Sequence, residues 1–179
     1  MDEIERLIAQ FRAENTSGLG DPGKSRKPGI VDSLARYSSD TRAFEFLLQI
    51  ASDANELDLV RIDVLKFLEV REPATNHERL MVASVLRNIL SEDPDDLVRG
   101  YAAMAARCYM DDDRLFKEMS DVLLNPKEDV DLRFNAFAVL ERMGASPRTL
   151  SIMWRVGQDA TLSKSAKRVL ASWNAANHG

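Results

Sequence analysis

The chain has 179 residues, of which 45% are hydrophobic and 30% are charged, so it has enough apolar material for one compact domain or one short repeat array. Charged residues interrupt the apolar runs, which excludes a membrane-spanning segment, and the acidic, amphipathic start differs from a secretory signal. Because Cys108 is the single cysteine, no internal disulfide can form, and we expect a cytoplasmic protein.

The net charge of −5 is unevenly distributed along the chain. Residues 1–39 hold six acidic and six basic side chains, residues 40–146 hold 22 acidic and 13 basic, and residues 147–179 hold one acidic and five basic. An acidic middle disfavours binding to a phosphate backbone, which requires clustered Lys and Arg. We therefore expect no nucleic-acid partner and favour a protein partner with a basic surface. The alternative is that these acids are helix N-caps and solvated helix faces.

Helical periodicity recurs along almost the whole chain, and no run alternates apolar and polar residues for long enough to predict a strand. Short acidic or proline-containing breaks at 91–96, 110–113, 125–129 and 145–147 have the composition of helix starts. We therefore predict an all-α chain of about ten short helices joined by short turns. Their ranges are 2–14, 29–38, 41–53, 56–70, 76–91, 95–110, 113–124, 129–143, 147–157 and 161–174.

These helices group into two parts and a tail. Residues 1–40 form an N-terminal helical hairpin with a flexible loop over 15–28. Residues 41–174 form a repeat array, and residues 175–179 are the tail.

Residues 18–25 satisfy the expression for a phosphate-binding loop, G-x-x-x-x-G-K-[ST], with Lys24 and Ser25 as its last two positions. Phosphate binding requires a strand before the loop and a helix that starts at its lysine, so that backbone N–H groups converge on the phosphate. Here the preceding segment has the pattern of an amphipathic helix, and we expect Pro28 to stop a helix four residues after the lysine. We therefore predict that this segment binds no nucleotide.

Three of the predicted helices open alike, with Asp-Leu-Val-Arg at 58–61 and at 96–99 and Asp-Leu-Arg at 131–133. The arginines are 38 and 34 residues apart, and small or apolar residues follow each of them at positions +3 and +7. A period of this length holds two helices and two turns, so each unit is one helical hairpin. Because one hairpin cannot bury its own apolar faces, we expect the units to stack into a superhelix.

This pattern resembles the HEAT-repeat family, whose second helix reads D-x-x-V-R-x-x-A-x-x-x-L. The resemblance covers roughly residues 41–143, with a decayed unit over 147–174. It implies a short right-handed α-solenoid and a hydrogen-bonded ladder of aspartate and arginine between successive repeats. The third unit departs from the pattern because Val130 stands at the aspartate position, and Ser163 replaces the arginine in the last unit, as suits a terminal cap. The ladder residues implied by the resemblance are Asp58, Arg61, Asp96, Arg99 and Arg133.

The sequence carries no convincing motif for metal binding or covalent catalysis. The two histidines are His77 and His178, and His77 lacks the second histidine that a zinc-protease helix carries four residues later. Residues 111–113 are three aspartates without the spaced oxygen ligands and the glycine of a calcium loop. A nucleophilic triad needs a placed histidine, for which His77 is the sole candidate. We therefore predict no cofactor, no metal and no enzymatic activity.

The aromatic residues fall at helical spacing. We expect most of the phenylalanines from Phe44 to Phe137 to lie in the core. Trp154 and Trp173 lie in the last two predicted helices, as core residues of the terminal unit or as anchors for a partner.

In a HEAT-like stack the second helix of each hairpin lines the concave surface. Counted from each motif arginine, positions −1, +3 and +7 face the core, so positions +2, +5 and +9 share another face. Tyr101 and Met104 lie at the middle of this face, and both residue types are enriched in protein interfaces. The alternative is that both only pack against the adjacent helix; Cys108, at +9, is either buried or half-exposed. The predicted partner-binding residues are Asp63, Lys66, Tyr101, Met104, Asn135, Arg142 and, from the last unit, Arg168.

These observations favour a protein-binding adaptor or inhibitor that is monomeric in the free state, without a membrane or nucleic-acid partner. Small acidic α-solenoids include immunity proteins that neutralise a bacterial toxin, and the chain is similar to them in size and charge. The alternative is a HEAT-like enzyme, either DNA glycosylase-like, which would need a basic groove, or bilin-lyase-like. The identity of the partner does not follow from the sequence.

Overall fold

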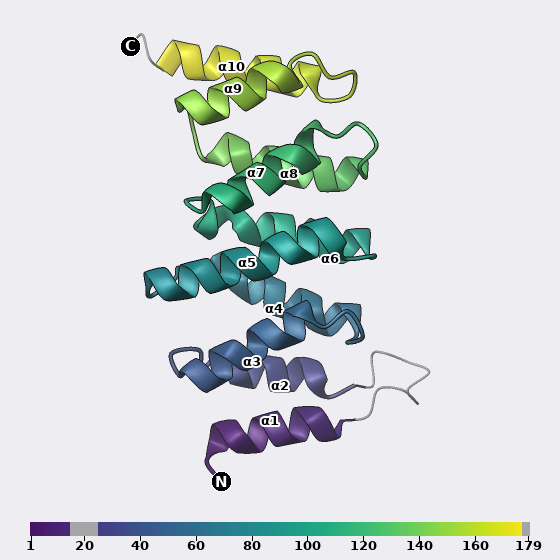
Figure 1. The fold of residues 1–179 in the computed structure, drawn as a ribbon, viewed down its shortest axis with the longest axis vertical. Helices are drawn as coiled ribbons and strands as arrows, with labels where there is room; N and C mark the ends of the chain where they lie inside the picture. Colours follow the sequence, from purple (N-terminus) through teal and green to yellow (C-terminus); the bar gives the residue numbers. More distant parts are fainter. Residues whose placement is uncertain (15–24, 177–179) are drawn as a thin grey trace.

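The part of the chain that the structure describes is helical and contains no β-strand (Figure 1). This computed structural model describes residues 1–14 and 25–176; residues 18–24 of the phosphate-loop motif, most of the predicted 15–28 loop and the last three residues of the tail lie outside the described residues. Over the described ranges, the all-α prediction and the predicted number of about ten helices are confirmed. The helices are α1 (Glu3–Ala13), α2 (Lys27–Ala35), α3 (Thr41–Ser52), α4 (Asp58–Val70), α5 (Asn76–Glu92), α6 (Asp96–Ala105), α7 (Asp113–Leu124), α8 (Val130–Arg142), α9 (Pro147–Val156) and α10 (Ser163–Ala176), with the 3-10 helix η2 (Ala106–Tyr109) continuing α6.

Although Leu57 before α4 makes no side-chain cap, five helices are capped by a polar residue in the break before them. In each case the side-chain oxygen accepts a hydrogen bond from a backbone N–H two or three residues further on. Such caps satisfy donors that the first helical turn leaves without a partner. Part of the acidity of residues 40–146 therefore serves to begin helices. The caps of α3, α6, α7, α8 and α9 are Asp40, Asp95, Asp112, Asp129 and Ser146.

Three of the predicted helix boundaries differ in the structure: both ends of α2 and the end of the helix predicted over 95–110. Pro28 does not stop a helix; it lies in the first turn of α2, which begins at Lys27, because a residue there needs no hydrogen-bonded N–H. At the other end of α2, Tyr37 and Ser38 donate their N–H groups to carbonyls three residues back, and a turn replaces the predicted last helical turn. The predicted helix over 95–110 is α-helical only to Ala105, after which it tightens into η2.

The helices pair into hairpins that stack along the long axis of the molecule, with the two termini at opposite ends (Figure 1). Helices α2, α4, α6 and α8 pack successively on one another, and we call them the second-helix row. Helices α3, α5, α7 and α9 form the other row. Helix α10 packs on α9 and makes little contact with α8.

The buried residues of the second-helix row repeat in the predicted register. Positions −1, +3 and +7 from each motif arginine are buried in α4, in α6 with η2, and in α8. The core is therefore one continuous layer between the two rows. Phe134, at position +1 of α8, is an exception among the phenylalanines because it is 42% exposed. It lies on the side of α8 that faces away from α6, and α10 does not cover that side.

Candidate protein-binding surface

The motif arginines join each hairpin to the next. In α4, α6 and α8 the Nε–H of the arginine donates to a carbonyl in the last turns of the preceding helix: Arg61 to Ala51 at 3.2 Å, Arg99 to Leu90 at 2.9 Å and Arg133 to Leu123 at 3.0 Å. The rest of the guanidinium reaches an acidic residue in the loop of the following hairpin. The cross-hairpin pairs are Arg61 with Asp93, Arg99 with Glu128 at 2.6 and 2.8 Å, and Arg133 with Asp159 at 2.6 Å.

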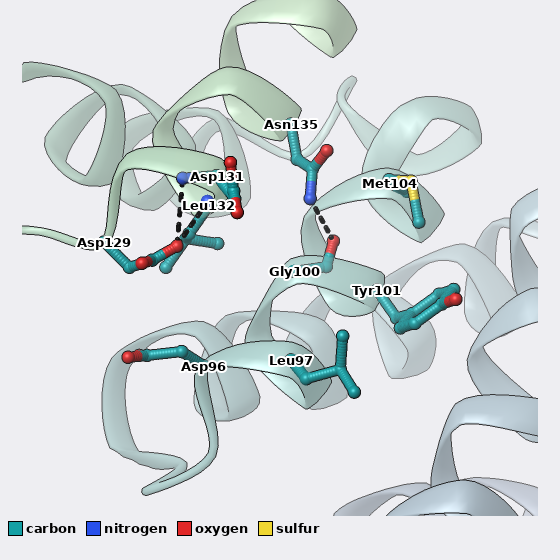
Figure 2. Close-up of a pocket in the computed structure, with 9 residues that line it drawn as sticks. All are labelled: Asp96, Leu97, Gly100, Tyr101, Met104, Asp129, Asp131, Leu132 and Asn135. Atoms are coloured by element: carbon teal, nitrogen blue, oxygen red, sulfur yellow. Dashed lines mark hydrogen bonds between the residues drawn. The ribbon is translucent and has the colours of Figure 1, made fainter.

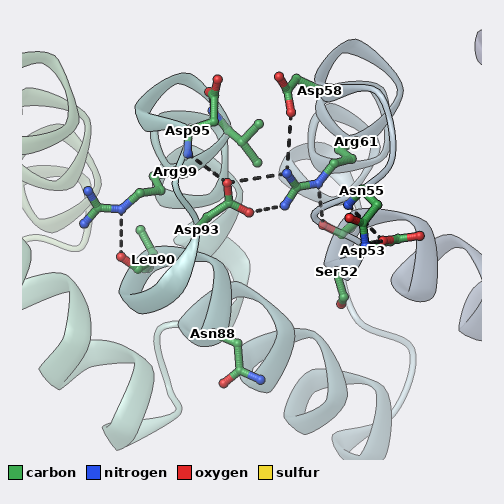
Figure 3. A network of polar contacts seen from close by, with 12 residues as sticks. Ser52, Asp53, Asn55, Asp58, Arg61, Asn88, Leu90, Asp93, Asp95 and Arg99 are labelled. Atoms are coloured by element: carbon green, nitrogen blue, oxygen red, sulfur yellow. Dashed lines mark hydrogen bonds and ion pairs between the residues drawn. The ribbon is translucent and has the colours of Figure 1, made fainter. Parts of the chain in front are cut away.

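The aspartates that the HEAT resemblance assigned to this ladder do not cross between hairpins. Asp58 lies 3.6 Å from Arg61, and Asp96 lies 3.0 Å from Arg99, each within its own helix and each at least half exposed. The crossing carboxylates come instead from the loops, and the Arg61–Asp93 pair in Figure 3 is almost fully buried. Loop residues of this kind follow no fixed spacing from the arginine, so the helix motif alone could not identify them.

A fourth rung of the ladder was missed at the sequence level. Lys27, at the start of α2, forms an ion pair of 2.5 Å with Glu56 in the loop before α4, and both side chains are 8% exposed. Glu56 is 29 residues after Lys27, the same separation as between Arg99 and Glu128. Lys27 also lies 4.6 Å from the centre of the Phe11 ring. Lys27, which falls within the predicted 15–28 loop, is thus packed in the first hairpin.

The environment of the ladder carboxylates favours their charged form. Hydrogen bonds from Arg99 hold the pKa of Glu128 below its ordinary value of 4.5. Burial raises the pKa of Asp159, but the hydrogen bonds from Arg133 and from the N–H groups of Leu162 and Thr161 together outweigh it, so the net shift is downward. Both acids are therefore ionised at neutral pH and serve the fold.

The solvent side of the second-helix row carries the predicted partner-binding residues of α4, α6 and α8. We call this surface the second-helix face. Its central contact is between α4 and α6, where the ammonium of Lys66 lies 5.4 Å from the centre of the Tyr101 ring and 3.5 Å from the Asp63 carboxylate. Between α6 and α8, the side-chain amide of Asn135 donates to the carbonyl of Gly100 at 3.4 Å (Figure 2). The structure thus brings five of the predicted residues together, since Met104 lies beside Tyr101 in the same pocket.

Arg142 and Arg168 lie apart from this group. Arg142 is exposed in the last turn of α8, and Arg168 on α10 is 3.8 Å from Glu141. Because α10 makes little contact with α8, Arg168 does not continue the second-helix face without interruption. At the far end of the stack from α1, Trp154 of α9 is 60% exposed, whereas Trp173 of α10 is partly buried against the core.

Two exposed leucines of this face were not predicted. Leu59 and Leu97, at position −2 of α4 and α6, are 55% and 59% exposed. The signal was available, because a residue four before position +2 lies on the same side of a helix. Together with half-buried Tyr101 and Met104, Leu97 gives the middle of the face an apolar surface.

Between α6 and α8 this surface deepens into a pocket of about 370 Å³ (Figure 2). Its acidic lining consists of Asp96, Asp129 and Asp131, and its apolar lining includes Leu97 and Leu132. Asp63 of α4 adds a further partly exposed carboxylate to the same face. The acids of the second-helix face that do not serve the ladder therefore gather around its apolar centre.

Other chemistry is not assembled in the described part of the chain. Among residues 1–14 and 25–176, no group of three or more His, Cys, Asp or Glu side chains is placed to hold a metal ion. Cys108 is half-buried near Glu72, at 3.5 Å, and burial raises the pKa of its thiol. No described helix is long and apolar enough to cross a membrane.

Comparison with known proteins adds no relative. No protein-family model, no curated protein and no solved structure matches this chain. The function is therefore inferred from the surface described above.

Proposed function

We propose that the chain is a HEAT-like protein-binding module, an adaptor or inhibitor, whose second-helix face binds a protein with a basic surface. The observation that carries this proposal is the exposed Leu97 beside half-buried Tyr101 and Met104, with the carboxylates of Asp96, Asp129 and Asp131 lining the same pocket. An apolar centre with an aromatic anchor and a charged rim is the usual anatomy of a protein interface. Stacked hairpins with equivalent arginines support the comparison with HEAT repeats.

Within this class, an immunity protein that neutralises a toxin fits the size and charge of the chain, and such an inhibitor would use its acids to attract a cationic partner. The DNA glycosylase-like and bilin-lyase-like alternatives stay predictions. Fluorescence anisotropy with a labelled DNA duplex at low salt tests the first directly. Saturable micromolar binding there would contradict the proposal of a protein partner.

Site-specific photo-crosslinking in the native cell tests the proposal. A benzophenone amino acid replaces Leu97 on the second-helix face or, as the matched control, Leu80 of α5, which is 50% exposed in the other row. We expect a specific adduct from position 97 and none from position 80. The adduct should disappear when Tyr101→Ala is added, because truncating a central aromatic anchor costs about 2 kcal/mol of binding or more.

The isolated partner then allows a kinetic test. Tyr101→Ala should weaken binding about 30-fold, mainly through faster dissociation. Asp63→Ala should mainly slow association and reduce its dependence on salt, since a rim charge acts on the encounter. If both variants bind like the wild type while the Leu80 position crosslinks, the interface lies on the other row.

A further inference from the structure

The pocket between α6 and α8 has two unlike sides. Figure 2 shows the carboxylates of Asp96, Asp129 and Asp131 on one side, and the side chains of Tyr101 and Met104 on the opposite side. Leu97 and Leu132 contribute the apolar surface of the same pocket. A ligand that fills it must therefore be apolar along its length and cationic at one end.

The three carboxylates of the pocket share one cationic partner among the described residues, Arg99. Asp96 accepts from Arg99, but that guanidinium makes two shorter hydrogen bonds to Glu128. Asp129 uses one oxygen to cap α8, by accepting from the N–H groups of Asp131 and Leu132. The exposed carboxylate of Asp131 forms no ion pair with the described residues. The pocket therefore has an excess of negative charge beside an apolar surface.

We infer that this pocket receives the side chain of one arginine of the partner, an inference that rests on the proposed protein-binding function. The stem of an arginine covers apolar surface while its charged end stays at the polar side. Its planar guanidinium has five N–H donors and binds carboxylates in pairs, whereas lysine offers a strongly hydrated point charge. The volume of about 370 Å³ is near the lower end of the range of small-molecule sites, so it suits one long side chain.

The probe for this inference is N-acetylarginine amide, and its control is N-acetylcitrulline amide, which has nearly the same shape without the charge. Both are titrated into the full chain with ¹³C-labelled methionine methyl groups and followed by NMR at the Met104 signal. We expect saturable shifts with the arginine probe and a Kd of about 1 mM, as is usual for a ligand of this size. The citrulline probe should bind at least about tenfold more weakly, since it cannot pair with the carboxylates.

Two variants of Asp131 and one control variant locate the cationic end. Asp131→Asn should weaken the arginine probe by about threefold or more, while Asp131→Glu should retain binding. Asp32→Asn, which removes an exposed carboxylate on α2, should bind the probe like the wild type. Should Asp131→Asn fail to fold, the comparison of arginine with citrulline on the wild-type chain still decides.

Three results would overturn the inference: no saturable shift at Met104, equal binding of citrulline, or equal binding of N-acetyllysine amide. None of these results would change the outcome of the crosslinking experiment. If position 97 crosslinks a protein in a Tyr101-dependent manner while the arginine probe fails, the proposed function stands and only the arginine pocket is wrong. If the crosslink fails while the probe binds, the proposed function is wrong and the pocket is a cation site of another kind.

Discussion

At the scale of single residues, burial separates the rungs of the ladder more sharply than the sequence motif does. The side chains of Arg61 and Asp93 are 1% and 4% exposed, whereas Arg99 and Glu128 are 13% and 16% exposed. Removing one member of a buried pair leaves an uncompensated charge, and the cost grows as solvent is excluded. Arg61 and Arg99 lie in the same motif and join hairpins in the same way, but they should contribute different amounts to the free energy of unfolding.

We therefore predict that Arg61→Ala lowers the free energy of unfolding by about 3–5 kcal/mol. Arg99→Ala should lower it by about 1.5–3 kcal/mol, the value of a hydrogen bond to a charged group, because solvent can reach the stranded Glu128. Urea unfolding measures both. Arg36→Ala, an exposed arginine after α2, is the control and should stay within about 0.5 kcal/mol of the wild type. Equal losses for Arg61 and Arg99 would show that burial does not rank these rungs.

Tyr109 provides a second connection between hairpins, independent of the ladder. Its side chain is fully buried in η2, and its hydroxyl donates to the carbonyl of Arg71 at 3.0 Å, at the end of α4. Burial raises the pKa of Tyr109 to about 12, because the phenolate would lose its hydration. The hydrogen bond holds η2 against the preceding hairpin.

This pKa predicts how stability depends on alkaline pH. Because the pKa of Tyr109 is higher in the folded state than its ordinary value of 10.0, its contribution is fully present below pH 10 and is lost as the pH rises toward about 12. Tyr109→Phe should cost about 0.5–1.5 kcal/mol at pH 8, for the lost hydrogen bond. Urea unfolding should show that the free energy of unfolding falls less between pH 8 and pH 11 for Tyr109→Phe than for the wild type. Equal losses would contradict the assignment.

At the scale of elements, two glycines with open surroundings differ in their backbones. A Cβ added at Gly29 or at Gly144 would meet nothing within 4 Å. Gly144 follows α8 with φ of 79°, in the left-handed region, whereas Gly29 lies in the first turn of α2. The space is thus equal, and only the conformation of the chain differs.

Gly144→Ala should therefore destabilise the fold by about 1–2 kcal/mol, the cost of a left-handed conformation for a residue with a Cβ. Gly29→Ala should stabilise it by up to about 1 kcal/mol, because alanine loses less conformational freedom in a helix. Thermal unfolding of the two variants side by side checks the opposite signs. A stabilising Gly144→Ala would mean that α8 ends in another way.

The elements also mark how far the sequence could predict the structure. Helices α3 to α9 begin within two residues of their predicted starts, because capping residues such as Asp95 and Asp112 act locally. Pro28 was misread because the same residue ends one helix or begins the next, and its neighbours in sequence do not decide between these roles. The role of Lys27 depends on Glu56, 29 residues away, so no local pattern could reveal it.

The candidate site was only partly predictable for a related reason. The grouping of Lys66, Tyr101 and Asn135 follows from the repeat register, since positions on the same face of adjacent helices become neighbours. Arg168 does not join them because the register assumes that α10 continues the row, and α10 packs on α9 instead. The pocket of Figure 2 depends on the spacing between α6 and α8, which no sequence position encodes.

At the scale of the whole molecule, the acid excess of residues 40–146 divides between two roles. Some acids cap helices, and Glu56, Asp93 and Glu128 hold successive hairpins together through the ladder. Others, such as Asp63 and Asp131, remain exposed or partly exposed on the second-helix face. Net charge alone therefore overstates what is available to a partner, and the same carboxylates link the stability of the stack to pH.

We predict that the stack loses stability in acid through the ladder. The pKa of Glu128 is lower in the folded state than its ordinary value of 4.5, so its contribution is fully present above pH 4.5 and is lost as the pH falls through the folded value. Each lost ion pair weakens a junction between hairpins, so unfolding should become easier along the whole chain.

Urea unfolding at pH 7 and at pH 3.5 measures this loss of stability. Glu128→Gln should be less stable than the wild type at pH 7 by about 1.5–3 kcal/mol, and should lose less than the wild type between the two pH values. Glu45→Gln, which removes an exposed carboxylate of α3 outside the ladder, should keep the wild-type difference. If Glu128→Gln and Glu45→Gln lose equally on acidification, the acid sensitivity comes from general charge and not from the ladder.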